Sequence, residues 1–200
     1  MLQVTEADLK ITYQQAGNTN IMYRLFIAID FPEPVKEKIA DIFYGVPHAR
    51  WTSLDQIHLT IRFIGEVEEY FFEEIKSALY TVHSAKMSIA LKGTGYFPLR
   101  KEPRVIWIGV EKNELLFQLS SRIERALVTA GCMPEKRKFH PHITIARIKE
   151  KVPSQKIMPF ISNTALFSIP DIQIDHFSLY SSELTRNGAV HTREESYSLI

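Results

Sequence analysis

The chain contains little of what several classes of protein require. It has one cysteine, Cys132, which excludes an intrachain disulfide and a metal cluster built from several thiolates. No apolar run approaches the roughly 20 residues of a membrane-spanning helix. The N-terminus, MLQVTEADLK, lacks the basic and apolar regions of a secretory signal. We therefore expect a protein without a membrane anchor that works in the reducing cytoplasm.

The chain also lacks a strong charge of either sign. Lys plus Arg number 24 and Asp plus Glu number 23, so the net charge is +1. No overall basic field exists that would hold a long nucleic acid, and any contact with nucleic acid must be local. Hydrophobic residues make up 45% of the chain, which is enough for a folded core. Because no heptad pattern is present, we expect a monomer.

The first part of the chain differs from the rest. Residues 14–20 (QQAGNTN) are polar and turn-like, and a strand pattern begins only at Met22. We therefore expect residues 1–21 to form an extension outside the core. No linker rich in proline, serine or glycine divides the remainder, so residues 22–200 are predicted to form a single domain.

A β-α-β pattern occurs twice within this domain. In each unit two apolar, β-branched segments, which predict buried strands, enclose a segment with helical spacing of its apolar residues. Duplicated units usually pack around a pseudo-twofold axis with a cleft where they meet. We therefore expect two lobes around a cleft. The units cover roughly residues 23–64 and 105–148, and their strands read YRLFIAID, IHLTIRFI, VIWIGV and HITIARI.

The segments outside the two units predict further elements. Residues 68–83 have the spacing of an amphipathic helix, and residues 87–96 resemble a strand. Near the C-terminus we expect two strands, over 172–181 and 190–198, around a turn at Arg186-Asn187-Gly188.

The last strand of each unit carries the pattern His-x-Thr. His58 and Thr60 belong to the first unit, and His142 and Thr144 to the second. Residues two apart in a strand point to the same face, so each pair shares a face. Random placement predicts roughly 0.4 such matches in this chain. Two matches at equivalent places of a repeat are therefore specific, although a single histidine on an apolar strand is more often a core residue.

These four side chains suit phosphodiester chemistry. Paired imidazoles can act as general base and general acid near neutral pH, and hydroxyl groups can donate to anionic oxygens. A non-catalytic site that binds RNA ends through the same histidines is an alternative. A zinc site at His140 and His142 is a further alternative, which is not favoured because Pro141 separates the two and no carboxylate is placed beside them.

The sequence resembles the two-histidine (2H) phosphoesterase superfamily. Within it, the chain is similar to the bacterial and archaeal RNA 2′,3′-cyclic phosphodiesterases, also named 2′-5′ RNA ligases. The resemblance covers about residues 22–200. It rests on RLFIAID at 24–30, IHLTIRFIGEV at 57–67, PRVIWIGV at 103–110, FHPHITIAR at 139–147 and FSLYSSEL at 177–184.

This resemblance implies a bilobal α+β fold with antiparallel sheets along the cleft and a catalytic quartet of His58, Thr60, His142 and Thr144. The implied reaction is hydrolysis of 2′,3′-cyclic phosphate ends of RNA or of nucleotides to 2′-phosphomonoesters, without a metal or other cofactor. Some members also join RNA through a 2′-5′ linkage. We assign His142 as the base and His58 as the acid, and the spacing leaves the opposite assignment open. Another cyclic or 2′-5′ phosphodiester is an alternative substrate.

Four further residues are candidates for substrate binding. The resemblance places Arg147 near the phosphate and Phe63 against a base. Each lies five residues after its histidine, so strand alternation points it away from the cleft unless a bulge intervenes. Arg62 shares the alternation of His58, and is expected either to face the cleft or to be a solvated charge. Tyr180 is expected either to line the cleft or to pack in the core.

Overall fold

The computed structural model describes residues 21–99, 102–186 and 188–200. The expected extension, residues 1–21, lies outside this part of the chain except for its last residue, and exposed Ile21 leads directly into the first strand. The chain forms the following elements: β1 (Met22–Asp30), α2 (Glu33–Ala40), β2 (Ala49–Trp51), η1 (Leu54–Gln56), β3 (His58–Glu68), α3 (Glu69–Leu79), β4 (Met87–Leu99), β5 (Glu102–Val110), α4 (Glu114–Thr129), β6 (His142–Ile148), η2 (Ser154–Lys156), α5 (Met158–Asn163), β7 (Ser168–Ile174), β8 (His176–Thr185) and β9 (Gly188–Ser198).

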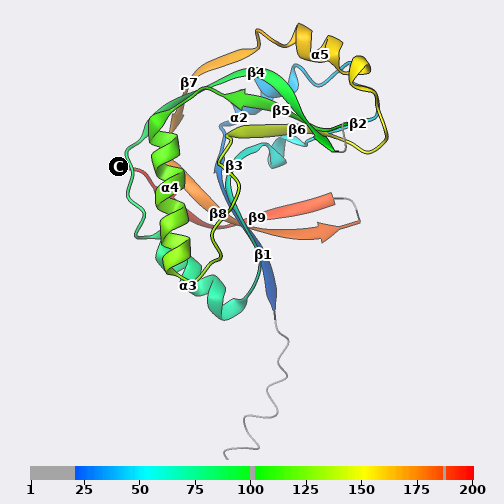
Figure 1. Cartoon of the computed structure of the whole chain (residues 1–200). Helices are drawn as coiled ribbons and strands as arrows, with labels where there is room; N and C mark the ends of the chain where they lie inside the picture. The colour runs from blue at the N-terminus through cyan, green and yellow to red at the C-terminus, as the bar shows by residue number, and fades with distance from the viewer. Residues whose placement is uncertain (1–20, 100–101, 187) are drawn as a thin grey trace, which may run out of the picture.

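Within the described residues, nine strands form one antiparallel sheet with two equivalent halves. Its order is β7-β4-β5-β6-β3-β1-β8-β9, and β2 pairs with the outer part of β6. The halves meet where β3 lies beside β6, and a single pair of residues, Leu59 and Ile143, is in register there. Each half begins at this contact with a strand that carries His-x-Thr, so the expected two-lobed α+β fold is confirmed (Figure 1).

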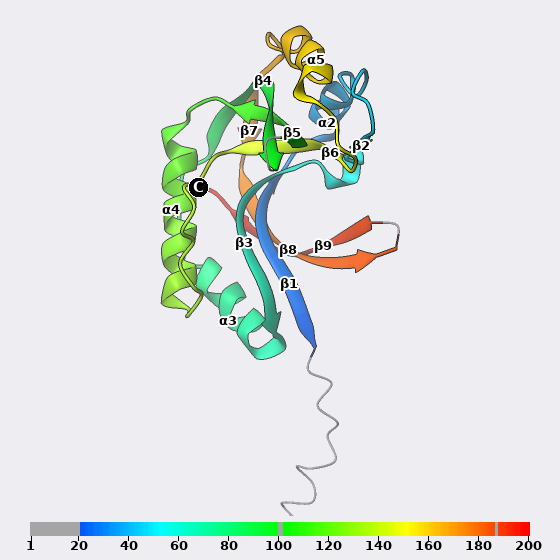
Figure 2. The same ribbon diagram turned by 45° about the vertical axis from the view of Figure 1, so that its right-hand side comes forward.

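Two helices cover the outer side of the sheet. α3 and α4 lie against each other in both views (Figures 1 and 2). α4 buries Leu116, Leu119, Ile123 and Leu127 at helical spacing. It begins at Asn113, whose side chain accepts a hydrogen bond from the Leu116 N–H, and it ends before Gly131, whose φ is +106°. No helix of the described residues is long and apolar enough to cross a membrane.

The predicted strand over residues 172–181 is wrong, because the chain there forms two strands in different halves. β7 pairs with β4 and ends at Ile174, whereas β8 begins at His176 and pairs with β1. Apolar residues alternate at Ile172 and Ile174 and again at Phe177 and Leu179, and the shift of phase between the two pairs coincides with the break at Asp175. The consequence is that the C-terminal hairpin, β8 and β9, belongs to the first half of the sheet and extends beside the cleft described below (Figure 1).

Candidate active site

A cleft of about 650 Å³ lies where the two halves of the sheet meet. Strands β1, β3 and β6 and the β8–β9 hairpin contribute most of its lining, and α3 and α4 contribute none of it. All four residues of the predicted quartet line this cleft, as do Phe63 and Arg147. The hairpin is tied to the opposite wall, because the side chain of Gln56 donates a hydrogen bond to the carbonyl of Ala189.

The pairing of Leu59 with Ile143 explains why the four residues converge. Each is the middle residue of its own His-x-Thr, so the two motifs run antiparallel on neighbouring strands with their centres side by side. Leu59 and Ile143 are fully buried, which turns the residues on either side of them to the opposite face of the sheet. That face is the floor of the cleft.

Each histidine ring is hydrogen-bonded to the backbone two residues earlier in the chain. Nδ1 of His142 lies 2.7 Å from the carbonyl oxygen of His140, and because that oxygen only accepts, the ring must donate from Nδ1. His58 forms a hydrogen bond to the backbone of Gln56, also two residues earlier in the chain. This bond raises the pKa of His58, as expected when a ring N–H donates to a carbonyl. When Nδ1 of neutral His142 carries the proton, its Nε2 is left as the basic nitrogen.

Both imidazoles are neutral at pH 7 in the ligand-free protein. Burial, together with repulsion by His191, lowers the pKa of His58 to about 4, against the opposing effects of the hydrogen bond to Gln56 and of Asp30. Burial also lowers the pKa of His142. Either ring can therefore take a proton from a water molecule, and the ring that is to donate one needs an anion nearby to raise its pKa.

A β-bulge follows each threonine at the same place of the repeat. In the pairing of β1 with β3, Thr60 lies opposite Ala28 and Arg62 opposite Ile27, so Ile61 has no partner. In the pairing of β5 with β6, Thr144 lies opposite Trp107 and Ala146 opposite Ile106, which leaves Ile145 unpaired. One extra residue reverses the alternation of side chains after that point.

These bulges bring Phe63 and Arg147 into the cleft. Both residues line the cleft, and strand alternation allows this only because a bulge intervenes. Phe63 is 53% exposed, which is unusual for a large apolar side chain and leaves its ring open to a partner. Two hydrogen bonds from Thr52 hold the backbone of the second bulge in place. Its N–H donates to the carbonyl of Ile145, and its hydroxyl donates to the carbonyl of Thr144. Arg147 therefore projects from a fixed backbone.

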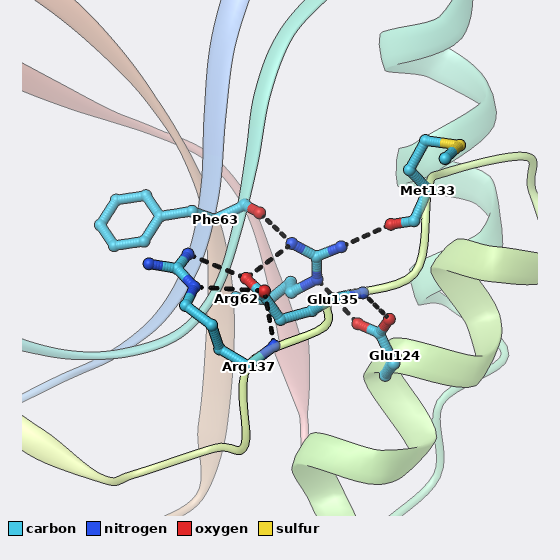
Figure 3. Close-up of polar contacts among 6 residues, drawn as sticks. All are labelled: Arg62, Phe63, Glu124, Met133, Glu135 and Arg137. Atoms are coloured by element: carbon cyan, nitrogen blue, oxygen red, sulfur yellow. Dashed lines mark hydrogen bonds and ion pairs between the residues drawn. The ribbon is translucent and has the colours of Figure 1, made fainter.

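The same reversal points Arg62 away from the cleft, so the structure does not place it where a substrate-binding role requires. Its side chain is 12% exposed and binds the carboxylates of Glu124 at 2.7 Å and Glu135 at 3.6 Å. It also donates to the carbonyl of Met133 at 2.7 Å and to that of Phe63 (Figure 3). Arg62 thus joins β3 to α4 and to the loop that leads into the second His-x-Thr motif.

Tyr180 also lies outside the main cleft. Its ring stacks on Phe26 at 5.3 Å between centroids, and its hydroxyl accepts a hydrogen bond from Arg193. Together with His58 it lines a second, smaller hollow of about 240 Å³, whose other lining residues are Asp30, Asp55, His191 and Arg193.

Sequence reasoning missed His191. It lies on β9, lines both hollows, and its ring makes an edge contact with that of His58 at 5.4 Å. His191 lies opposite Ser182 in the hairpin, one position from where a turn over residues 186–188 places it. Nothing in the sequence shows that β8 pairs with β1, and this pairing is what brings His191 to the site.

The lining holds no obvious metal centre. Among the described residues, no group of three or more His, Cys, Asp or Glu side chains lies close enough together to hold a metal ion. His140 packs its ring near Trp107, at 5.9 Å between centroids, and near Phe97 at 6.0 Å.

Comparisons with known proteins identify the class to which this fold and site belong. The family model described as LigT like Phosphoesterase matches the chain twice, over residues 29–107 and 108–191. Each match contains one His-x-Thr motif, as the internal repeat requires. The chain therefore belongs to the LigT-like phosphoesterases of the 2H superfamily.

Curated relatives and solved structures agree with this. An RNA 2′,3′-cyclic phosphodiesterase of Thermotoga maritima is 35% identical, with 84% of this chain and 91% of that protein covered. One of Methanocaldococcus jannaschii is 34% identical, with 84% and 96% covered. Among solved structures, Escherichia coli LigT complexed with 3′-AMP matches with a TM-score of 0.71 and 26% identity, covering 90% of this chain and 99% of that one.

The role of Arg62 can be tested by stability. We expect Arg62→Ala to lower the free energy of unfolding by roughly 2–3 kcal/mol, because several acceptors at partly buried positions lose a charged donor. Urea unfolding measures this. Arg125→Ala, at an exposed position one residue after Glu124 on α4, is the control and should change stability by less than about 0.5 kcal/mol. Equal effects of the two substitutions would contradict the role.

The burial of His58 predicts a pH dependence of stability. The unfolded chain binds a proton at His58 near pH 6.5, whereas the folded chain does so only near its pKa of about 4. Stability is therefore full above pH 6.5 and falls as the pH drops from 6.5 to 4. His58→Gln should flatten this decline in urea midpoints, whereas His83→Gln, at an exposed position, serves as the matched control. A decline that is equally steep in His58→Gln would refute the prediction.

Proposed function

We propose that this protein hydrolyses 2′,3′-cyclic phosphate ends of RNA or nucleotides to 2′-phosphomonoesters, with His58 and His142 as the two proton carriers. The observation that supports this most is the placement of two equivalent His-x-Thr motifs side by side on the floor of one cleft. The names of the relatives, RNA 2′,3′-cyclic phosphodiesterases, support the same reaction. A LigT structure that holds 3′-AMP supports a nucleotide as the ligand.

The reaction needs two proton transfers. The base takes a proton from water, the water oxygen attacks phosphorus, the bond from phosphorus to the 3′ oxygen breaks, and the acid gives a proton to that oxygen. Thr60 and Thr144 would donate to the non-bridging oxygens, and Arg147 would add a positive charge beside them. A five-membered cyclic phosphate is strained, so these groups suffice without a further nucleophile.

We keep His142 as the base and His58 as the acid. Asp30 lies opposite His58 in the strand pairing, and among the described residues it is the carboxylate that favours the charged form of this ring. No carboxylate acts on His142 in this way within the described part of the chain. The anionic phosphate would raise the pKa of His58 further on binding, so that the ring can carry the proton that an acid must donate.

The alternative without turnover, a module that binds RNA ends, is less well supported. Binding a phosphate needs donors, and the hydroxyl groups with Arg147 already provide them. Two buried imidazoles that are neutral at pH 7 add little to anion binding, whereas they are well suited to moving protons. Ligation through a 2′-5′ linkage would break the same bond from phosphorus to the 3′ oxygen, with the 5′ hydroxyl of a second RNA attacking in place of water, so the same site would serve both reactions.

The proposal is tested with a short oligoribonucleotide that ends in a 2′,3′-cyclic phosphate, in the presence of EDTA. Wild type should convert it to the 2′-phosphate, identified by phosphorus NMR. His58→Ala and His142→Ala should each lose about 10²-fold or more in kcat, because each removes one proton carrier. His83→Ala is the control for loss of a histidine outside the cleft. Activity that EDTA abolishes and zinc restores would favour the zinc site instead, and tight binding without turnover would favour the binding module.

The paired imidazoles also predict a bell-shaped rate profile. The apparent pKa values that define its two limbs belong to the pair. Because burial lowers the pKa of both histidines, kcat/KM, which reports the free enzyme, should be largest below about pH 6.5. The maximum of kcat should lie at higher pH, because bound phosphate raises both pKa values. A rate that is constant from roughly pH 5 to 9 would contradict acid–base chemistry by the pair.

A further inference from the structure

The cleft continues well beyond the four residues of the quartet. Its lining follows β1 backwards from the level of Thr60, through Phe26 and Leu25, to Arg24 near the start of the strand. Arg24 belongs to the same hollow as His58 and Arg147, and it is exposed. The cleft therefore has one arginine near the second His-x-Thr motif and another at the far end of the first lobe.

The register of β1 with β3 gives the order of groups along this floor. Thr60 lies opposite Ala28, Phe63 opposite Phe26, and Glu66 opposite Arg24. Four residues of strand separate Ala28 from Arg24, which is about 13 Å. From the reacting centre outward, the floor thus presents hydroxyl and imidazole groups, then an exposed aromatic ring, then a guanidinium.

The path between Phe63 and Arg24 is open. Gly65 occupies the position opposite Leu25 with φ of +99°, and a Cβ atom built there would meet nothing within 4 Å. Glu66 is the cross-strand neighbour of Arg24, yet the ion pairs among the described residues do not join the two. Arg24 is thus a cation that lines the cleft next to the open space at Gly65.

This order of groups matches that of an RNA chain. In a nucleotide chain successive phosphates are joined through a ribose that carries one base, and single strands are held by aromatic rings that stack on bases and cations that contact the backbone. With the cyclic phosphate at the quartet and the terminal base on Phe63, the next phosphate on the 5′ side lies toward Arg24. A long guanidinium side chain can reach back along the strand to meet it.

We infer that Arg24 forms a second phosphate-binding subsite, which takes a backbone phosphodiester on the 5′ side of the reacting end. This inference rests on the proposed function and specifies its substrate class: the cleft is built for an oligoribonucleotide end in preference to a cyclic mononucleotide. Arg24 binds without taking part in the chemistry, because it lies far from the reacting phosphorus.

The experiment compares adenosine 2′,3′-cyclic phosphate with the dinucleotide ApA that ends in the same group. Wild type should have a larger kcat/KM for the dinucleotide. Arg24→Gln should lower kcat/KM at least fivefold more for the dinucleotide than for the mononucleotide, mainly through KM. Arg125→Gln removes the same charge from the exposed side of α4 and is the control for a general loss of positive charge. Phe63→Ala should weaken both substrates, because both carry the terminal base.

Binding of the two products gives a readout that does not depend on turnover. Calorimetry with adenosine 2′-phosphate and with ApA 2′-phosphate, over a range of salt concentrations, measures how many phosphates are contacted. For the dinucleotide, Arg24→Gln should reduce the slope of log K against log salt by about 0.7, the value for one phosphate of a single strand.

The outcomes separate the subsite from the reaction. Equal losses for both substrates in Arg24→Gln, or an unchanged salt slope for the dinucleotide, would overturn the subsite even if hydrolysis is observed. An Arg24-dependent preference in the binding experiment, without hydrolysis of either compound by wild type, would support the subsite and refute the proposed reaction.

Discussion

The site depends on the pairing of two buried residues, Leu59 and Ile143, at the joint between the two halves of the sheet. They are the central residues of the two His-x-Thr motifs, so burying one against the other places each histidine beside the threonine of the other strand. This contact combines a structural requirement with a functional one. The apolar pair closes the core on one face, and strand alternation then directs the four polar side chains to the other face. Neither half of the repeat contains a complete site, and the cleft exists only where they meet.

The two bulges extend this site beyond its centre. A regular strand would present every second residue to the cleft, which would bring in Arg62 and exclude Phe63 and Arg147. The unpaired residues Ile61 and Ile145 reverse the alternation, so that the aromatic ring and the guanidinium enter the cleft. The reversal also frees Arg62 for a structural role on the outer side, where it binds the loop before the second motif. One local irregularity, repeated in both halves, therefore turns Phe63 and Arg147 into the cleft and, in the first half, leaves Arg62 to join β3 to α4.

Much of this could be predicted from the sequence, and the parts that could not share a physical cause. The repeat, the two motifs and most strands follow from local patterns of apolar residues. The bulges do not, because a buried isoleucine in a bulge looks the same in sequence as a buried isoleucine in a regular strand. Regular alternation therefore assigns Arg62 to the face of His58, whereas the bulge turns it to the other face. The placement of β7 and β8 in different halves of the sheet and the position of His191 depend on which distant strand lies alongside. Such long-range pairings are set by the packing of the whole sheet, and no local pattern encodes them.

The two histidines have different surroundings although their motifs are duplicated. The repeat provides the same ring, the same neighbouring hydroxyl group and the same hydrogen bond two residues back in each half. The walls differ. His142 packs edge-on against Phe97 at 4.8 Å, and the charged groups that act on its pKa, His140 and Arg147, both lower it. His58 instead has Asp30 and His191 nearby, and these groups act on its pKa in opposite directions. Because acid and base must differ in proton affinity during one reaction, these unequal walls support the division of labour that we propose, and the matched motifs fix only the geometry within which it would operate.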